Sequence, residues 1–104
     1  MIPGRFSKQP YEEFFWGADF SDVLDTDNES IILGSSSIAA VDNGNLADDT
    51  VYYVATLMVV SLSILAVRVK AGTTALSPYK LTYKIETSAG NKYEKDVLMS
   101  VIDV

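Results

Sequence analysis

An uncharged run of seventeen residues, VYYVATLMVVSLSILAV at 51–67, limits what this chain can fold into. As an α-helix it would be about 26 Å long, slightly less than the roughly 30 Å of hydrocarbon in a bilayer. Seven of its residues are β-branched, and two tyrosines stand near its start. Such residues favour strands over helices. We therefore expect two central strands, buried on both sides or against a partner, and no membrane span. Two strands could meet near Ser61 and Ser63, and whether 51–62 is one strand or two stays open.

The residues downstream of this run alternate between apolar and polar side chains. In PYKLTYKIETSAG, at 78–90, the apolar residues take every second position, which is typical of a half-buried antiparallel strand. KYEKDVLMSVIDV, at 92–104, returns with a second apolar face after a short turn in which Gly90 can take positive φ. These two segments predict a C-terminal hairpin. LAVRV at 65–69 alternates in the same way and predicts a strand before it.

The rest of the chain predicts further short strands separated by turns. EEFFWGADF alternates through Phe14, Trp16 and Ala18, and ESIILGSSSIAAVD reads as one or two strands interrupted at Gly34. Short strands with frequent turn signals in about 100 residues indicate a single β-sandwich domain. We place it at 12–104, after an extended N-terminal arm at 1–11. The arm either orders on a neighbouring subunit or frays.

Composition excludes several kinds of function. The first fifty residues hold ten acidic side chains and two basic ones, and the whole chain has a net charge of −6. Such a balance argues against nucleic acid as a partner, because Lys and Arg dominate phosphate binding. The chain has no cysteine and no histidine, so it lacks a disulfide, a thiolate nucleophile and the commonest general base.

No motif for catalysis or for a cofactor is present. The segment Asp25-Thr-Asp27-Asn-Glu29 has oxygen ligands at alternate positions, but an EF-hand loop needs Gly and Glu where this chain has Ser30 and Ser36. A solvated turn is favoured, and calcium binding is left open. Clustered aspartates at 19, 22 and 25 are more typical of capping than of acid–base catalysis. We expect no enzyme, no cofactor and no catalytic residue.

Apolar residues exceed what one small core needs, which predicts an interface. On the last strand, Leu98, Ile102 and Val104 lie on the face opposite the core, and Phe14 and Trp16 add an aromatic cluster near the N-terminus. We expect these five residues to contact another protein or a second copy. The alternative is that they are scattered surface aliphatics and core aromatics.

Motifs at both ends resemble the fibre–tail adaptor proteins of tailed phages and prophages. At the front these are Lys8-Gln9-Pro10, Asp19-Phe20-Ser21 and Glu29-Ser30-Ile31. At the end they are Tyr79, Thr87-Ser-Ala-Gly90, Glu94 and the face formed by Val97, Met99 and Val101. The chain departs from the family at Gly72, where members often carry two glycines, and residues 36–62 match only in general character.

The resemblance implies an immunoglobulin-like antiparallel β-sandwich, of about seven strands, without enzymatic activity. It also implies a virion protein, assembled in the bacterial cytoplasm, that connects tail, tail-fibre or head–tail components. Its partners would be other tail, fibre or connector proteins, with homo-oligomers as a further possibility. The competing hypothesis is a ligand-binding sandwich, such as a carbohydrate-binding or adhesin-like module. That function would need exposed aromatic side chains, for which the candidates are Trp16, Tyr52, Tyr53 and Tyr93.

Overall fold

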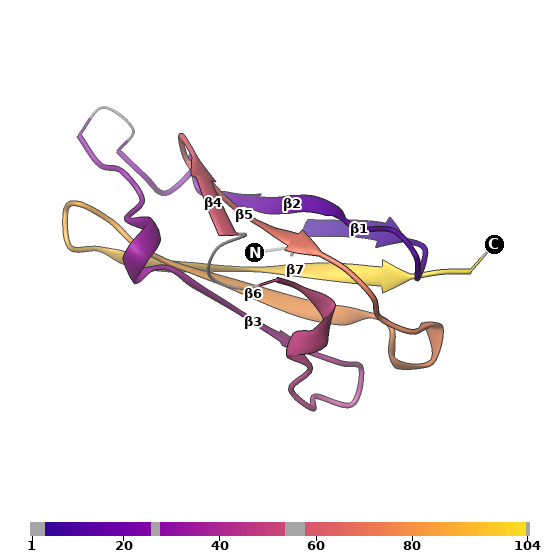
Figure 1. Ribbon diagram of the computed structural model, residues 1–104. Coiled ribbons are helices and arrows are strands. Elements are labelled where there is room, and N and C mark those ends of the chain that lie inside the picture. The colour runs from indigo at the N-terminus through magenta and orange to yellow at the C-terminus, as the bar shows by residue number, and fades with distance from the viewer. Residues whose placement is uncertain (1–3, 26–27, 54–57, 104) are drawn as a thin grey trace.

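Two β-sheets pack face to face in the computed structural model, which describes residues 4–25, 28–53 and 58–103 (Figure 1). One sheet has the strand order β1-β7-β6-β3 and the other has the order β2-β5-β4. The prediction of an all-β sandwich is therefore confirmed. The elements are β1 (Gly4–Lys8), β2 (Phe14–Asp19), η1 (Leu33–Ser35), β3 (Ser37–Val41), η2 (Asp49–Val51), β4 (Met58–Ser61), β5 (Ile64–Val69), η4 (Thr74–Leu76), β6 (Tyr79–Glu86) and β7 (Lys92–Val101).

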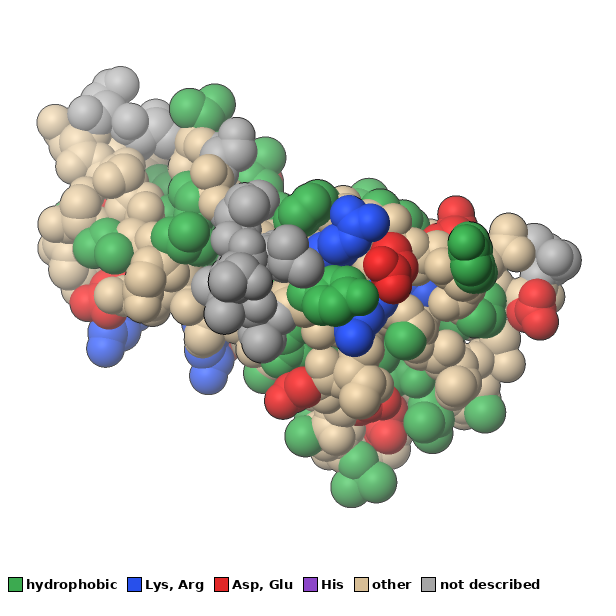
Figure 2. Space-filling model, viewed as in Figure 1, with side chains coloured by type: hydrophobic (Ala, Val, Ile, Leu, Met, Phe, Trp, Pro, Cys, Tyr) green, Lys and Arg blue, Asp and Glu red, His purple; other side chains and the backbone are tan. Residues whose placement is uncertain are grey.

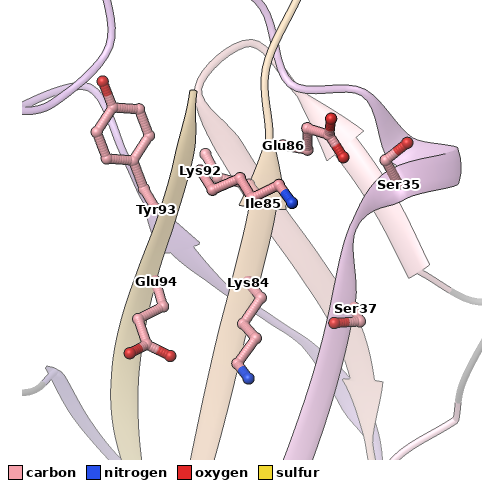
Figure 3. Close-up of a pocket in the computed structure, with 8 residues that line it drawn as sticks. All are labelled: Ser35, Ser37, Lys84, Ile85, Glu86, Lys92, Tyr93 and Glu94. Carbon is pink, nitrogen blue, oxygen red and sulfur yellow. The ribbon is translucent and has the colours of Figure 1, made fainter. Parts of the chain in front are cut away.

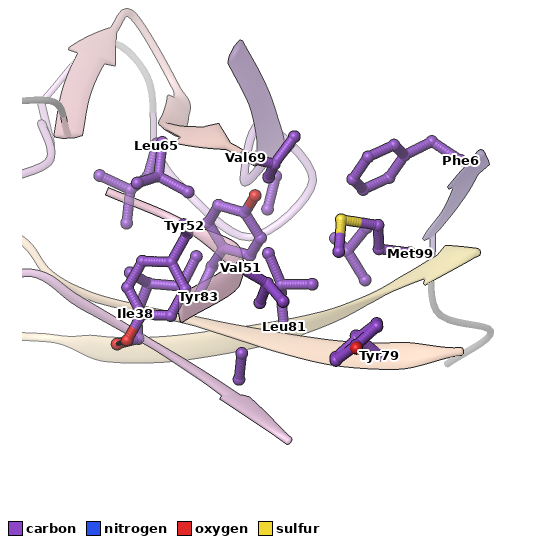
Figure 4. Close-up of a cluster of buried hydrophobic side chains, with 14 of the residues drawn as sticks. Phe6, Ile38, Val51, Tyr52, Leu65, Val69, Tyr79, Leu81, Tyr83 and Met99 are labelled. Atoms are coloured by element: carbon purple, nitrogen blue, oxygen red, sulfur yellow. Dashed lines mark hydrogen bonds between the residues drawn. The ribbon is translucent and has the colours of Figure 1, made fainter. Parts of the chain in front are cut away.

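The core lies between the sheets and follows the alternation of the strands (Figure 4). On β6, every second side chain from Tyr79 to Ile85 is buried, and on β5 Leu65, Val67 and Val69 are fully buried. β6 and β7 form the predicted hairpin, in which Gly90 has a φ of 82°. Burial of alternate side chains from both sheets is what makes these short strands stable together.

The uncharged run at 51–67 contributes to several elements. It begins in the η2 turn, continues into β4 and ends in β5, and a two-residue turn at Leu62 and Ser63 joins the two strands. Only β5 is central. β4 pairs with β5 alone among the described strands, so the expectation of two central strands is wrong for β4. No helix in the described part of the chain is long and apolar enough to cross a bilayer.

Residues 4–8, which we had expected within an N-terminal arm, form β1 in the sandwich of their own chain. β1 pairs in parallel with β7, from Gly4 opposite Val97 to Lys8 opposite Val101. Phe6 is buried, and so is Lys8, whose Nζ donates to the carbonyls of Gln9 at 2.8 Å and Ala71 at 2.5 Å. Burial lowers the pKa of Lys8, while nearby glutamates oppose that shift. Buried side chains and a shared sheet make this segment part of the domain.

Candidate functional site

The candidate site is the seam at which edges of the two sheets meet. β1 is an edge strand of one sheet and β2 of the other, and they lie side by side in opposite directions (Figure 1). The Lys8 carbonyl accepts a hydrogen bond from the Ile102 N–H at 2.9 Å, so the backbone groups of Lys8 and Phe6 face β7. Because these groups alternate along a strand, those of Arg5 and Ser7 point toward the free edge.

β2 presents a second free edge to the same seam. The Phe20 N–H donates to the Ser63 carbonyl at 2.8 Å, which means that even-numbered residues of β2 bond to β5. The backbone groups of Phe15 and Gly17 therefore point away from β5. Within residues 4–25, 28–53 and 58–103, neither edge has a strand partner. Unpaired edges of this kind can accept an extended segment as an additional strand.

An aromatic cluster of Phe6, Phe14 and Trp16 closes the seam between these edges. The Phe6 ring stacks on the Trp16 indole with centroids 4.4 Å apart and meets Phe14 edge-on at 5.9 Å. The Tyr83 hydroxyl, from the opposite sheet, donates to the Trp16 carbonyl at 2.8 Å. Burial raises the pKa of Tyr83, so this donor keeps its proton at neutral pH. Trp16 remains 37% exposed, which leaves apolar surface beside the free edges.

A groove of about 440 Å³ opens beside the aromatic cluster. Its apolar lining includes Trp16 and Val97, and its polar end includes Asp22 and Lys95. The Lys95 ammonium donates to the Asp22 carboxylate at 2.6 Å and to the Asp19 carbonyl at 2.7 Å. The groove therefore combines an apolar floor, a fixed ion pair and free backbone groups, which are the elements of a peptide-binding surface.

The structure brings four of the five predicted interface residues to β1, but on different faces. Phe14 and Trp16 contact Phe6 within the seam. Leu98 lies opposite Arg5 on the outer face of the sheet, and Ile102, 46% exposed, follows β7. Val104 lies outside the described residues. The four described residues are thus divided between the seam and the outer face.

The sequence did not predict the roles of Phe6, Arg5 and Ser7. These residues were assigned to the arm because Pro3, Gly4 and Pro10 disfavour regular structure. The pairing of β1 with β7 joins segments from opposite ends of the chain and leaves little local signal. Local alternation in GRFSK is the only sequence signal, and the buried Lys8 interrupts it, since lysine is almost never fully buried.

The aromatic residues proposed for ligand binding are mostly occupied within the protein. Tyr52 is buried, and its hydroxyl donates to the Ile38 carbonyl at 2.9 Å, so it is not the exposed platform that a ligand-binding sandwich would need. Lys70 lies over the Tyr53 ring at 4.2 Å. Tyr93 is half-buried against the core. Trp16 has one face covered by Phe6, which leaves its other face as the best exposed of the candidates.

A second hollow, of about 410 Å³, lies on the sheet β1-β7-β6-β3 (Figure 3). Lys84 stands opposite Glu94, and Glu86 opposite Lys92, across the β6–β7 pair. Opposite charges at facing positions stabilise antiparallel strands. The hollow therefore fits a solvated sheet face better than a binding site.

The acidic segment around Glu29 has a structural role. The Glu29 carboxylate accepts hydrogen bonds from the Thr87 hydroxyl at 2.5 Å, the Asn91 amide at 2.8 Å and the Asp25 N–H at 3.0 Å. These bonds hold the pKa of Glu29 below its usual range, with Thr87 as the main cause. Asp27 lies outside the described residues. Among the residues that are described, no group of three or more acidic side chains could hold a metal ion.

Comparison with known proteins identified no relative of this chain. No protein-family model matches the chain, and no curated protein matches it significantly.

Proposed function

We propose that this chain is a non-enzymatic virion protein of a tailed phage, which connects tail, tail-fibre or head–tail components through protein–protein contacts. The observation that carries the proposal is the pair of free strand edges beside the aromatic cluster of Phe6, Phe14 and Trp16. The motifs that resemble those of fibre–tail adaptor proteins support the proposed virion setting. Such a protein would be found in the assembled virion, after synthesis in the bacterial cytoplasm.

An extended segment of a partner is the occupant that suits these edges. Added to β1, it would bond to the outward N–H and C=O groups of Arg5 and Ser7, and its side chains would meet Trp16 and the groove. Main-chain bonds would supply affinity, and alternate side chains would supply specificity. The acidic charge of the chain would favour partners that carry basic residues.

We also propose that the sandwich is of the immunoglobulin type, with about seven strands. If β2 to β7 are lettered B to G, the two sheets contain B-E-D and G-F-C, which is the division found in immunoglobulin domains. β1 would then be an A strand that pairs with G.

A hydrogen bond at the start of β6 supports this assignment. The Tyr79 hydroxyl accepts a bond at 3.0 Å from the Thr73 N–H, six residues upstream. Immunoglobulin sandwiches carry a similar tyrosine corner near the start of strand F, where the hydroxyl bonds to backbone a few residues upstream.

Coexpression with the tail and tail-fibre proteins of the same phage tests the connector function. We expect the native chain to form a complex with one of them. Ser7→Pro removes an N–H that faces the free edge, a position where sheets tolerate proline, and it should abolish the complex. Ser7→Thr keeps the N–H and should bind as the native chain does. A native chain that binds none of these proteins contradicts the proposal.

A ligand-binding module is the second candidate, favoured by the exposed face of Trp16 beside the groove. A sugar stacked on this face would shift the fluorescence of the single tryptophan. We would titrate a panel of bacterial surface glycans. No shift with any of them would contradict this function and leave the connector proposal standing.

A further inference from the structure

The turn between β4 and β5 places a leucine where the backbone favours glycine. Ser61 pairs with Ile64, so Leu62 and Ser63 form a two-residue loop. Leu62 has a φ of 54° and is 92% exposed. The turns that fit such a loop require positive φ at the first residue, which glycine or asparagine adopts readily. A leucine there is strained, and its side chain stands in water. The fold itself thus gains nothing from leucine at this position.

The tip of this hairpin is an apolar projection. Ile64, on the same hairpin, is 38% exposed, and a groove of about 310 Å³ beside Leu62 is lined in part by Leu24. Hydrophobic side chains stand out over the β4–β5 hairpin in the upper part of Figure 2. Strained residues that persist in a fold are concentrated at functional sites. An exposed and strained leucine therefore points to a contact outside the chain.

The charges around the tip indicate what kind of surface it meets. The exposed Asp19 carboxylate accepts a bond from the Ser63 hydroxyl at 2.9 Å, and Glu29, which is itself largely buried, lines the groove beside Leu62. Hydrogen bonds from the Ser21 N–H and then from the Ser63 hydroxyl hold the pKa of Asp19 below its usual range, so it is ionised at neutral pH. Lys95 lies beside Asp19 and pairs with Asp22, but Asp19, Asp22 and Glu29 together leave the surroundings of the tip net negative. This negative charge would repel the same tip of a second copy and would repel anionic lipid. It would attract Lys and Arg.

We propose that Leu62 is an anchor residue that inserts into an apolar pocket bordered by Lys or Arg on a partner tail or tail-fibre protein. The inference rests on the proposed connector function and gives it a contact distinct from the β1 edge. A buried aliphatic anchor surrounded by complementary charge is how a small interface gains both affinity and orientation.

Leu62→Asn tests this inference in the coexpressed complex. Asparagine tolerates positive φ, so the variant should raise the melting temperature of the free chain by about 4 °C or more. Loss of the anchor should weaken the complex about 10- to 100-fold. Leu46→Asn is the matched control, because Leu46 is also well exposed, at 69%, but lies in the loop after β3. That variant should bind as the native chain does.

The outcomes separate this inference from the function on which it rests. If Ser7→Pro abolishes the complex and Leu62→Asn leaves its affinity unchanged, the anchor role of Leu62 is overturned but the connector function is not. A native chain that binds no tail or tail-fibre protein overturns both. Light scattering of the native chain and of Leu62→Asn completes the test by measuring their masses in solution. If the native chain is a homo-oligomer and Leu62→Asn is a monomer, the tip binds a second copy, which also overturns the proposal.

Discussion

The Phe6 ring lies nearly parallel to the Trp16 indole, with an interplanar angle of 21° and centroids 4.4 Å apart. This contact joins β1 to β2 across the seam, although the two strands belong to different sheets. It holds the first strand of the chain in place while leaving one face of the indole open to solvent. The same pair of residues thus closes the core and shapes the surface that we propose as a binding edge.

Phe6→Ala should lower the free energy of unfolding by about 3–5 kcal/mol, because it removes a buried ring and leaves a cavity beside Trp16. Phe15→Ala is the control. Phe15 lies one residue from Trp16 on the same strand but is 44% exposed, so its loss should cost less than about 1 kcal/mol. Urea denaturation followed by Trp16 fluorescence measures both. Equal losses would show that the stacked pair does not hold β1.

Gly17→Ala should destabilise the chain by about 1–3 kcal/mol, because overpacking forces neighbours to move. A Cβ at Gly17 would lie 2.6 Å from Ile64 Cγ2 and 2.8 Å from the Leu65 carbonyl oxygen. Gly34→Ala is the matched control, since a Cβ there meets nothing within 4 Å, and it should change stability by less than about 0.5 kcal/mol. If both variants melt together with the native chain, β2 and β5 pack less closely than the structure indicates.

Glu29 should make the fold sensitive to acid. Its pKa is lowered in the folded chain, first by the Thr87 hydroxyl and then by the Asn91 amide. A lowered pKa adds stability that is fully present above the unfolded value, near 4.5, and is lost as pH falls through the folded value. Glu29→Gln should therefore flatten the pH dependence of the melting temperature below pH 4.5, measured between pH 3 and 7.

Thr87→Val provides the companion measurement for Glu29. It removes the strongest hydrogen bond to the carboxylate, so it should also reduce the acid sensitivity, although less than Glu29→Gln does. If the melting temperature of the native chain stays constant as the pH is lowered from 4.5 to 3, the role assigned to Glu29 is contradicted.

Local patterns were sufficient to predict β2, β5 and the β6–β7 hairpin. The β6–β7 hairpin and β5 follow from alternation and from the turn at Gly90. β2 follows from Phe14, Trp16 and Ala18, which all face the other sheet or the seam. On β5 and β6 one face is buried, so the sequence carries a clear period of two, whereas on β2 only Ala18 is buried and the alternation is weaker.

The parts that were missed depend on contacts between distant segments or on an unusual backbone. β1 pairs with β7, from the other end of the chain. The buried Lys8 ammonium also holds β1 in place, because it donates hydrogen bonds to the Gln9 and Ala71 carbonyls in two loops. No local pattern encodes such contacts. The sharp turn at Leu62 carries neither Gly nor Pro, so its position could be suspected from the flanking serines but its geometry could not. The candidate site lies at the first of these features, β1, which is why the sequence yielded only some of its residues.

Tyr79→Phe should destabilise the chain by about 1–2 kcal/mol, because it removes a buried acceptor from the Thr73 N–H. The ring itself would stay in place, so the loss reports the hydroxyl alone. Hydrogen exchange at the Thr73 amide should accelerate in the same variant, since that N–H loses its 3.0 Å partner. Tyr93→Phe removes a hydroxyl from a half-buried ring on β7 and should alter neither quantity. If Tyr79→Phe and Tyr93→Phe were indistinguishable in both measurements, the hydroxyl of Tyr79 would not anchor the loop before β6. The Tyr79 bond would then no longer support an immunoglobulin-like assignment, and only the strand order would support it.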